Sequence, residues 1–226
     1  MFKHILFDAD NTLFDFDQME RNAFFDTMRA FFVPCDDALY NRYRAANRLL
    51  WLEFEQGRTD RAEALAKRFE VLLDGMDIDG AGMNQLYQYN LAEHTVMMPY
   101  ALELCEALSR SFELSIVTNG VGPTQRRKLD HTPLEPYFAF QFISEEVGVS
   151  KPDIRFFEHV MDALGNPDRG DVLIVGDSLT SDIQGGMNAG LSTCWLNREG
   201  APVPEGYRID YMIGGLEELE DILLAE

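Results

Sequence analysis

Cysteine is scarce in this chain of 226 residues, which contains only Cys35, Cys105 and Cys194. The three lie far apart, without a CxxC pair and without a nearby histidine at metal-binding spacing. This scarcity argues against a disulfide framework and against a cysteine-based zinc site. We expect the three thiols to be reduced and mostly buried, as in a protein of the reducing cytoplasm.

Positive charge is also scarce, since 19 lysines and arginines face 39 acids and the net charge is −20. A nucleic acid polymer is therefore not expected as a partner, because affinity for DNA or RNA depends on neutralising phosphates with basic side chains. One small phosphate remains compatible with this composition, because a single local cation and a metal ion can outweigh a negative surface.

Long hydrophobic runs are missing as well, and no apolar stretch approaches the length of a membrane span. The first residues do not resemble a secretory signal peptide, because acids follow a short apolar run at once. We therefore expect no membrane partner and a cytoplasmic location. The oligomeric state cannot be inferred from these features.

An apolar content of 46% is enough for a large core, and its pattern divides the chain into two parts. Over residues 17–95, apolar side chains recur at helical spacing with no strand between them, which predicts four helices. Asp60 and Glu63 have the spacing of a capping box at the start of the third helix. We therefore expect a helical-bundle domain at residues 16–96.

Strands and helices alternate in the rest of the chain. Short apolar runs predict strands at residues 2–7, 112–117, 138–143, 172–175 and 192–196. Helical patterns follow them at residues 101–108, 151–164, 182–189 and 216–224. This alternation predicts an α/β fold, a doubly wound parallel sheet with helices on both faces. Residues 1–15 and 97–226 would form this core domain, and the helical bundle would interrupt it where it could cover a site.

Two acids follow the first predicted strand, in the run Asp8-Ala9-Asp10-Asn11-Thr12. In extended backbone, positions 8 and 10 point the same way. Two like charges aimed together raise the free energy unless a cation or a shared proton compensates them. A plain turn after the strand is the alternative interpretation of this run.

Further polar residues follow other predicted strands: Thr118, Asn119 and Gly120 follow the second, and Asp177 follows the fourth. Lys151 stands at the start of a predicted helix, which would place its ammonium near the same rim. Because ligands of open parallel sheets bind outside the carboxyl ends of the strands, we expect these residues to converge there.

The charges of this group point to a metal ion. Asp8, Asp10, Asp177 and Asp182 bring up to four negative charges to one cleft, against the single positive charge of Lys151. Oxygen ligands of this kind suit Mg²⁺, and Mn²⁺ accepts similar ligands. For Asp182, an N-cap of the following helix is an alternative role, and the residue could combine both.

These residue types fit phosphoryl transfer from a small-molecule phosphate monoester. Asp8 would attack phosphorus and form an aspartyl-phosphate, while Asp10 would protonate the leaving oxygen and then activate water. Lys151 would stabilise Asp8 and the phosphoryl oxygens. Thr118 and the amides near Asn119 and Gly120 would hold those oxygens, and Thr12 is a further candidate for the phosphate site.

The motifs at residues 8–12, 116–120, 148–152 and 176–182 (DADNT, IVTNG, GVSKP and GDSLTSD) resemble the four motifs of the haloacid dehalogenase-like (HAD) hydrolases. The resemblance implies a Rossmann-like core with an inserted helical cap, a nucleophile at Asp8 and a general acid/base at Asp10. It also implies Mg²⁺ bound by Asp8, by the backbone carbonyl of Asp10 and by Asp177. Asn11 stands where many members have glycine, in a position that favours permissive backbone.

Other segments look like the pyrimidine 5'-nucleotidase branch, namely residues 47–51, 57–59, 143–149, 165–169, 185–190 and 193–197. This likeness implies hydrolysis of UMP, dUMP, TMP and related nucleotides. Phe16, Trp51 and Phe54 are candidates for stacking on a base, although helical periodicity also explains them as bundle core. Arg58 and Asn47 are candidates for contact with the base or sugar.

Other functions are also compatible with parts of this pattern. A sugar-phosphate phosphatase or a phosphomutase would use the same motifs. A dehalogenase is disfavoured because a halide leaving group needs no acid at the position of Asp10. A phosphorylatable receiver, which binds a phosphoryl group without turnover, is disfavoured by the long insertion and by the second acid.

Overall fold

The computed structural model describes residues 2–73 and 79–224. It contains two compact units, one formed by Met1–Phe16 with Val96–Glu226 and the other by Asp17–Thr95. We call them the sheet unit and the helical unit. None of the helices in the described ranges combines the length and the hydropathy that crossing a bilayer requires.

The sheet unit is built on six parallel strands in the order β3-β2-β1-β4-β5-β6. The strands are β1 (His4–Phe7), β2 (Glu113–Thr118), β3 (Phe138–Ile143), β4 (Val172–Gly176), β5 (Ser192–Leu196) and β6 (Tyr211–Ile213). This arrangement confirms the predicted doubly wound α/β fold. The five predicted strands are present, whereas β6 was not predicted, because three residues are too few to show a period.

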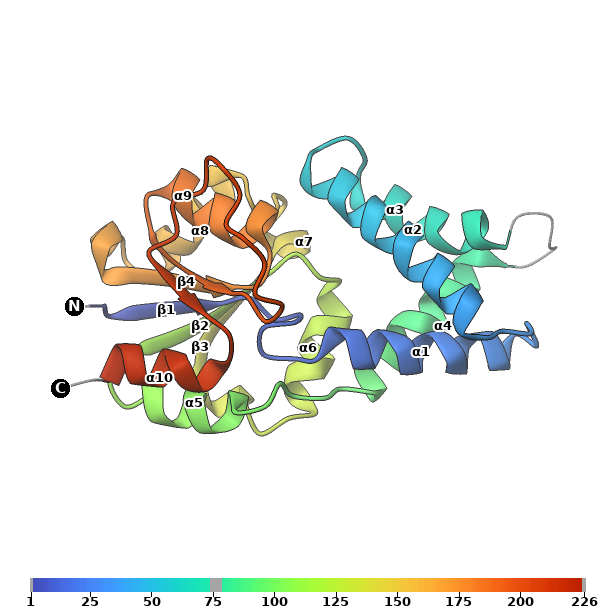
Figure 1. The fold of residues 1–226 in the computed structure, drawn as a ribbon, viewed down its shortest axis with the longest axis horizontal. Helices are drawn as coiled ribbons and strands as arrows, with labels where there is room; N and C mark the ends of the chain where they lie inside the picture. The colour runs from blue at the N-terminus through green and yellow to red at the C-terminus, as the bar shows by residue number, and fades with distance from the viewer. Residues whose placement is uncertain (1, 74–78, 225–226) are drawn as a thin grey trace. The chain divides into compact units, whose positions relative to one another are not determined.

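Helices lie on both faces of the sheet, with α8 and α9 on one side and α5 and α10 on the other (Figure 1). The helices of this unit are α5 (Ala101–Leu108), α6 (Gly122–Asp130), α7 (Ser144–Val147), α8 (Ile154–Ala163), α9 (Gln184–Ala189) and α10 (Leu216–Leu224). Because both faces are covered, the central strands are continuously apolar: β4 is buried throughout, and Ile5, Leu6 and Phe7 of β1 are fully buried.

Two helix predictions need correction at their N-terminal ends. Helix α8 begins at Ile154 and not at Lys151, because the carboxylate of Asp153 accepts the Arg155 amide at 2.9 Å and so takes the N-cap position. Residues 179–183 form a π-helical turn, η3 (Leu179–Ile183), and α9 follows it. Lys151 therefore lies in the turn before a helix, and Asp182 lies inside a helical turn.

Helix α6 was not predicted. Its sequence, GPTQRRKLD, contains a single large apolar residue, Leu129, and therefore lacks the helical period on which such predictions depend. The helix nevertheless buries the polar side chains of Thr124, Gln125 and Lys128.

The described residues of the helical unit form the four predicted helices, α1 (Phe16–Ala30), α2 (Asp37–Glu55), α3 (Arg61–Leu72) and α4 (Gly80–Glu93). Helix α1 begins at Phe16, the last residue of the first segment of the sheet unit. Asp60 caps α3 by accepting the Glu63 amide at 2.8 Å, as the capping pattern predicted. Aromatic rings form the core of the unit, and Tyr43 stacks on Phe69 with the ring centroids 5.4 Å apart.

A buried polar group accompanies these rings. The amide of Asn47 donates to Glu20 at 2.8 Å, and the guanidinium of Arg44 lies 3.7 Å from the same carboxylate. Arg68 is buried and lies 4.4 Å from the centroid of the Tyr87 ring. Asn47 thus serves the interior of the helical unit, which corrects its assignment as a contact with a base or sugar.

Because Glu20 is buried, we predict that the free energy of unfolding of the protein depends on pH. Burial raises the pKa of Glu20 from 4.5 to about 7, against the opposing effects of Asn47 and Arg44. Between these values the folded chain holds a proton that the unfolded chain has lost, so the free energy of unfolding falls as the pH rises. The contribution is present below pH 4.5, is lost by about pH 7, and amounts to about 3 kcal/mol.

The variant Glu20→Gln should lack this contribution. Urea unfolding of both proteins from pH 4 to 8 should therefore show that the unfolding free energy of the wild type falls relative to that of Glu20→Gln as the pH rises. Asp37→Asn, at a carboxylate that is 73% exposed, is the control. Parallel pH profiles for the wild type and Glu20→Gln would contradict the prediction.

Candidate active site

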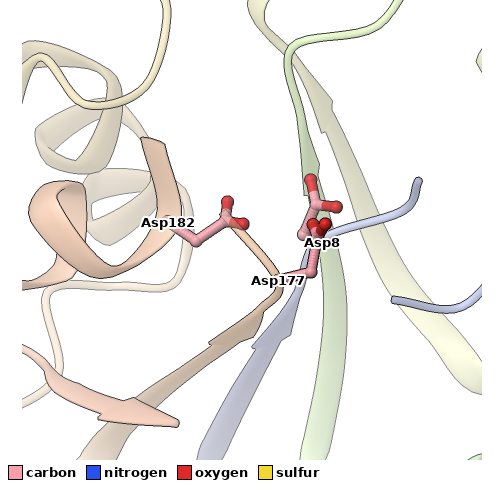
Figure 2. A group of neighbouring side chains, drawn as sticks. All are labelled: Asp8, Asp177 and Asp182. Atoms are coloured by element: carbon pink, nitrogen blue, oxygen red, sulfur yellow. The ribbon is translucent and has the colours of Figure 1, made fainter. Parts of the chain in front are cut away.

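The site lies where the strand order reverses, between the adjacent strands β1 and β4. The Asp8 amide donates to the Val175 carbonyl at 2.8 Å, so Asp8 leaves the sheet beside the end of β4, which Asp177 follows. Figure 2 shows Asp8 and Asp177 at the ends of these strands, with Asp182 pointing toward them from a helical turn. Carboxylate oxygens of the three residues lie within 4.8 Å of one another.

Lys151 is the cation of this group. Its ammonium donates to Asp8 Oδ1 at 2.7 Å, to Asp182 Oδ1 at 2.6 Å and to the Val117 carbonyl at 2.7 Å. An ammonium has three protons, so all of its donors are used. The side chain is 1% exposed, and its hydrogen bonds therefore join β1, β2 and η3 in a water-poor setting.

The electrostatics of this group favour a further cation. Burial raises the pKa of Asp8 to about 7 despite Lys151, and burial together with Asp8 and Asp182 raises the pKa of Asp177 well above its ordinary value. For Lys151, burial alone would lower the pKa, but Asp182 and Asp8 raise it. One ammonium does not compensate three carboxylates, and the oxygen donors fit a hard divalent ion such as Mg²⁺.

Asp10 has different partners. Its Oδ2 accepts the Gln125 amide at 2.6 Å, and its Oδ1 accepts the Lys128 ammonium at 2.5 Å. The group of potential metal-ligating carboxylates consists of Asp8, Asp177 and Asp182 among the described residues, so Asp10 does not join it through its side chain. Its backbone carbonyl is the metal contact that the family resemblance implies.

The loop between Asp8 and Thr12 turns sharply. The amides of Leu13 and Phe14 both donate to the Ala9 carbonyl at 2.9 Å. Asn11 has φ +61°, in the left-handed region that glycine and asparagine accept best, which confirms the expected need for permissive backbone. Thr12 is buried, and its hydroxyl lies 3.5 Å from Asp8 Oδ2.

The residues after β2 support Lys151. The side chain of Asn119 donates to the Lys151 carbonyl at 2.9 Å and accepts the Lys151 amide at 3.0 Å. The Gly120 amide donates to the hydroxyl of Thr118 at 3.1 Å. The side chain of Asn119 therefore holds the turn that carries Lys151, and the assignment of Thr118, Asn119 and Gly120 to phosphate binding stays a prediction.

The turn after β4 is held by its own polar groups. Ser178 is the N-cap of η3, which corrects the N-cap role suggested for Asp182. Asp182 Oδ2 instead accepts the Ser178 amide at 3.1 Å, while its Oδ1 binds Lys151. The indole of Trp195 donates to the Asp177 carbonyl at 2.9 Å and fixes the backbone there.

Sequence reasoning missed Gln125, Lys128 and Trp195. Gln125 and Lys128 are three residues apart, a spacing that places them on one side of a helix. Nothing in the local pattern indicates that this side faces Asp10, because α6 itself lacks an apolar period.

Comparison with known proteins identifies the same family that the four sequence motifs resemble. The family model for the haloacid dehalogenase-like hydrolases matches residues 2–190. Pyrimidine 5'-nucleotidase YjjG of Escherichia coli is 37% identical over 97% of this chain and 96% of its own length. Pyrimidine 5'-nucleotidase PynA of Streptococcus pneumoniae is 36% identical over 87% of this chain and 84% of its own.

A solved structure is also similar over nearly the whole chain. It is a crystal structure of the HAD-hydrolase YfnB from Bacillus subtilis, described as bound to magnesium and as revealing interdomain movement. Its TM-score is 0.94 at 37% identity, and the match covers 98% of each chain. The likeness therefore includes the inserted helices as well as the sheet.

Gly176→Ala tests the packing of Asp182. A Cβ added at Gly176 would lie 2.6 Å from the Cβ of Asp182 and nearer still to its carboxylate. Because that carboxylate is buried between Lys151 and Ser178, we expect overpacking to lower the unfolding free energy by about 1–3 kcal/mol in urea titrations. Gly170→Ala, with no atom within 4 Å of the added Cβ, is the control and should change stability far less.

Mg²⁺ should stabilise the folded protein independently of any turnover. A ligand that binds only the folded state adds about 2.7 kcal/mol at 100 times its dissociation constant, so Tm should rise with Mg²⁺ concentration. Asp177→Asn should remove most of this rise, whereas Asp171→Asn, at a residue paired with Lys3, should retain it. An equal rise in Asp177→Asn would contradict a metal site at this cluster.

Proposed function

This chain belongs to the haloacid dehalogenase-like hydrolases, and on that premise we propose that it hydrolyses nucleoside 5'-monophosphates, with a preference for pyrimidines. The reaction would proceed through an aspartyl-phosphate on Asp8. The observation that carries the proposal is the pair Asp8 and Asp10: two acids two residues apart that have separate cationic partners, Lys151 and Lys128.

Separate partners suit the two different tasks that hydrolysis of a phosphate ester requires. Asp8 acts as the nucleophile, and one of its oxygens bonds to phosphorus while the bond from phosphorus to the leaving oxygen breaks. Asp10 gives its proton to that leaving oxygen. In the second half, Asp10 takes a proton from water as the water oxygen attacks phosphorus, which releases inorganic phosphate and regenerates Asp8.

Lys151 holds Asp8 in place for this attack. Its ammonium is already bonded to Asp8, Asp182 and the Val117 carbonyl, so the nucleophile does not need to be reoriented during the reaction. Its positive charge also lowers the repulsion between the Asp8 carboxylate and a phosphate dianion. Thr12 and the residues after β2 line the same end of the sheet and are candidates for holding the phosphoryl oxygens.

A divalent ion fits the remaining negative charge. We propose that Asp8, Asp177 and the backbone carbonyl of Asp10 hold Mg²⁺ or Mn²⁺, with Asp182 beside them. When bound, the ion supplies positive charge that neutralises the phosphate and the nucleophile together. The donor set, consisting of oxygens only, and the raised pKa values of Asp8 and Asp177 support this assignment.

The preference for pyrimidine nucleotides is supported by the relatives. Two proteins named as pyrimidine 5'-nucleotidases share 36% and 37% identity with this chain over most of their length. The half-buried Trp51 and Phe54 of α2, whose ring centroids are 5.5 Å apart, remain candidates for stacking on a base. A small-molecule ester is also the kind of partner that suits a chain with net charge −20.

A phosphate-release assay tests this proposal. The substrates are UMP, dUMP, TMP, AMP, GMP and several hexose phosphates, assayed with Mg²⁺, and Asp8→Asn is the blank. We expect faster release from the pyrimidine nucleotides and a loss of at least about 10³-fold in Asp8→Asn, because the variant lacks the nucleophile.

The alternatives give different results in the same assay. Faster release from hexose phosphates would replace the nucleotidase by a sugar-phosphate phosphatase with the same mechanism. Release that is unchanged in Asp8→Asn would contradict the aspartyl-phosphate. A stoichiometric phosphoryl group that persists on the chain without turnover would indicate a receiver.

A further inference from the structure

We propose that Lys128 and Gln125 of helix α6 are positioning residues for Asp10, which orient its carboxyl group toward the leaving oxygen of the substrate. This inference rests on the proposed function, because it gives α6 a role in the proton transfer that Asp10 performs there. It extends that function to a helix outside the four sequence motifs.

The contacts around Asp10 are short and specific. Lys128 Nζ binds one carboxylate oxygen at 2.5 Å, and Gln125 Nε2 binds the other at 2.6 Å. The side chain of Lys128 is 0% exposed, whereas that of Asp10 is 26% exposed. A buried ammonium therefore holds an acid that remains accessible from solution.

This arrangement leaves Asp10 able to react. Each carboxylate oxygen offers two lone-pair sites, so one bond from Lys128 and one from Gln125 occupy two of four sites. The remaining sites can carry the proton and meet the leaving oxygen or a water molecule. With both oxygens held, rotation of the carboxyl group is restricted, and this restriction lowers the entropic cost of reaching the reactive orientation.

The contact between Gln125 and Asp10 requires a glycine at position 120. A Cβ added at Gly120 would lie 2.7 Å from the side-chain Cδ of Gln125 and closer still to its amide nitrogen. A larger residue at position 120 would therefore displace Gln125 from Asp10. The glycine that follows Thr118 and Asn119 thus makes room for the contact between Gln125 and Asp10.

Gln125 is held in this place although it leaves one of its own atoms unsatisfied. Its Oε1 is buried and has no hydrogen-bond partner among the described residues. An unsatisfied buried acceptor lowers the stability of a protein, so a position of this kind is expected where it serves a function. Its orientation is determined by Asp10, since only the Nε2 end can donate to a carboxylate.

Lys128 has a second contact, with an aromatic ring. Its ammonium lies 5.5 Å from the centroid of the Phe16 ring, within the range of a cation–π interaction. Phe16 and Asp10 thus contact the same ammonium. A lysine with these two contacts and no exposure is not a solvated surface residue, although the polar sequence of α6 suggests one.

The test uses the chemistry of the leaving group. An alkyl phosphate such as UMP needs a proton on its leaving oxygen, whereas p-nitrophenyl phosphate releases a stable phenolate that needs none. The ratio of kcat/KM for UMP to kcat/KM for p-nitrophenyl phosphate therefore measures proton donation by Asp10 in the first step. A defect in folding lowers both values together and leaves the ratio unchanged.

Lys128→Met is the main variant, and Gln125→Met is the second, which keeps the test valid if the first one folds poorly. Asp10→Asn shows how far the ratio falls when the proton donor is absent. Arg126→Met is the control, because it removes a charge from the exposed side of α6, where Arg126 pairs with Glu146. We expect the ratio to fall about 10²-fold in Asp10→Asn and in Lys128→Met. It should fall less, in the same direction, in Gln125→Met, and remain unchanged in Arg126→Met.

The outcomes separate the inference from the function on which it rests. If the ratio falls in Asp10→Asn but not in Lys128→Met or Gln125→Met, the positioning role is wrong and the proposed mechanism stands. If the ratio is unchanged even in Asp10→Asn, the acid role of Asp10 is wrong, and the positioning role is overturned with it. Equal losses with both substrates in the α6 variants would indicate a purely structural role.

Discussion

The ammonium of Lys151 is the interaction on which the site depends. Within the described ranges, it is the one cation that forms ion pairs with this group of three carboxylates, and its three protons bind Asp8, Asp182 and the Val117 carbonyl. These partners come from the ends of β1 and β2 and from the turn after β4. A single buried charge thus holds together segments that are far apart in the sequence. Its hydrogen bonds are stronger than they would be in water, because the local dielectric constant is low.

The geometry of neighbouring residues follows from this constraint. Asn119 holds the backbone of Lys151 with two hydrogen bonds, which brings the lysine to the sheet from a turn and not from a helix. Gly176 leaves the space that the Asp182 carboxylate fills. Excess negative charge nevertheless remains and raises the pKa values of Asp8 and Asp177 together with burial, and a bound divalent ion would compensate this charge.

A second cation, Lys128, gives Asp10 a partner of its own. Two acids that follow one strand two residues apart thereby have different surroundings, one among carboxylates and the other beside an amide and an ammonium. Different surroundings of this kind allow two identical carboxyl groups to take different roles, which the proposed mechanism requires of Asp8 and Asp10. The helical unit has its own core and its own buried polar group, in which Glu20 and Asn47 take part.

The sequence by itself determined the fold class, four helices of the helical unit, five strands and the acids that follow them. The helices and strands were predictable because their periods show within a few residues of sequence. The place of the acids was predictable because the carboxyl ends of the strands in a parallel sheet lie at one edge. Only the tertiary structure decided which partner each acid receives. Lys128 and Asp10 are 118 residues apart, and α6 has no apolar period to show that its polar side turns inward. The same holds for Lys151, whose three acceptors were brought together by the folding of the sheet.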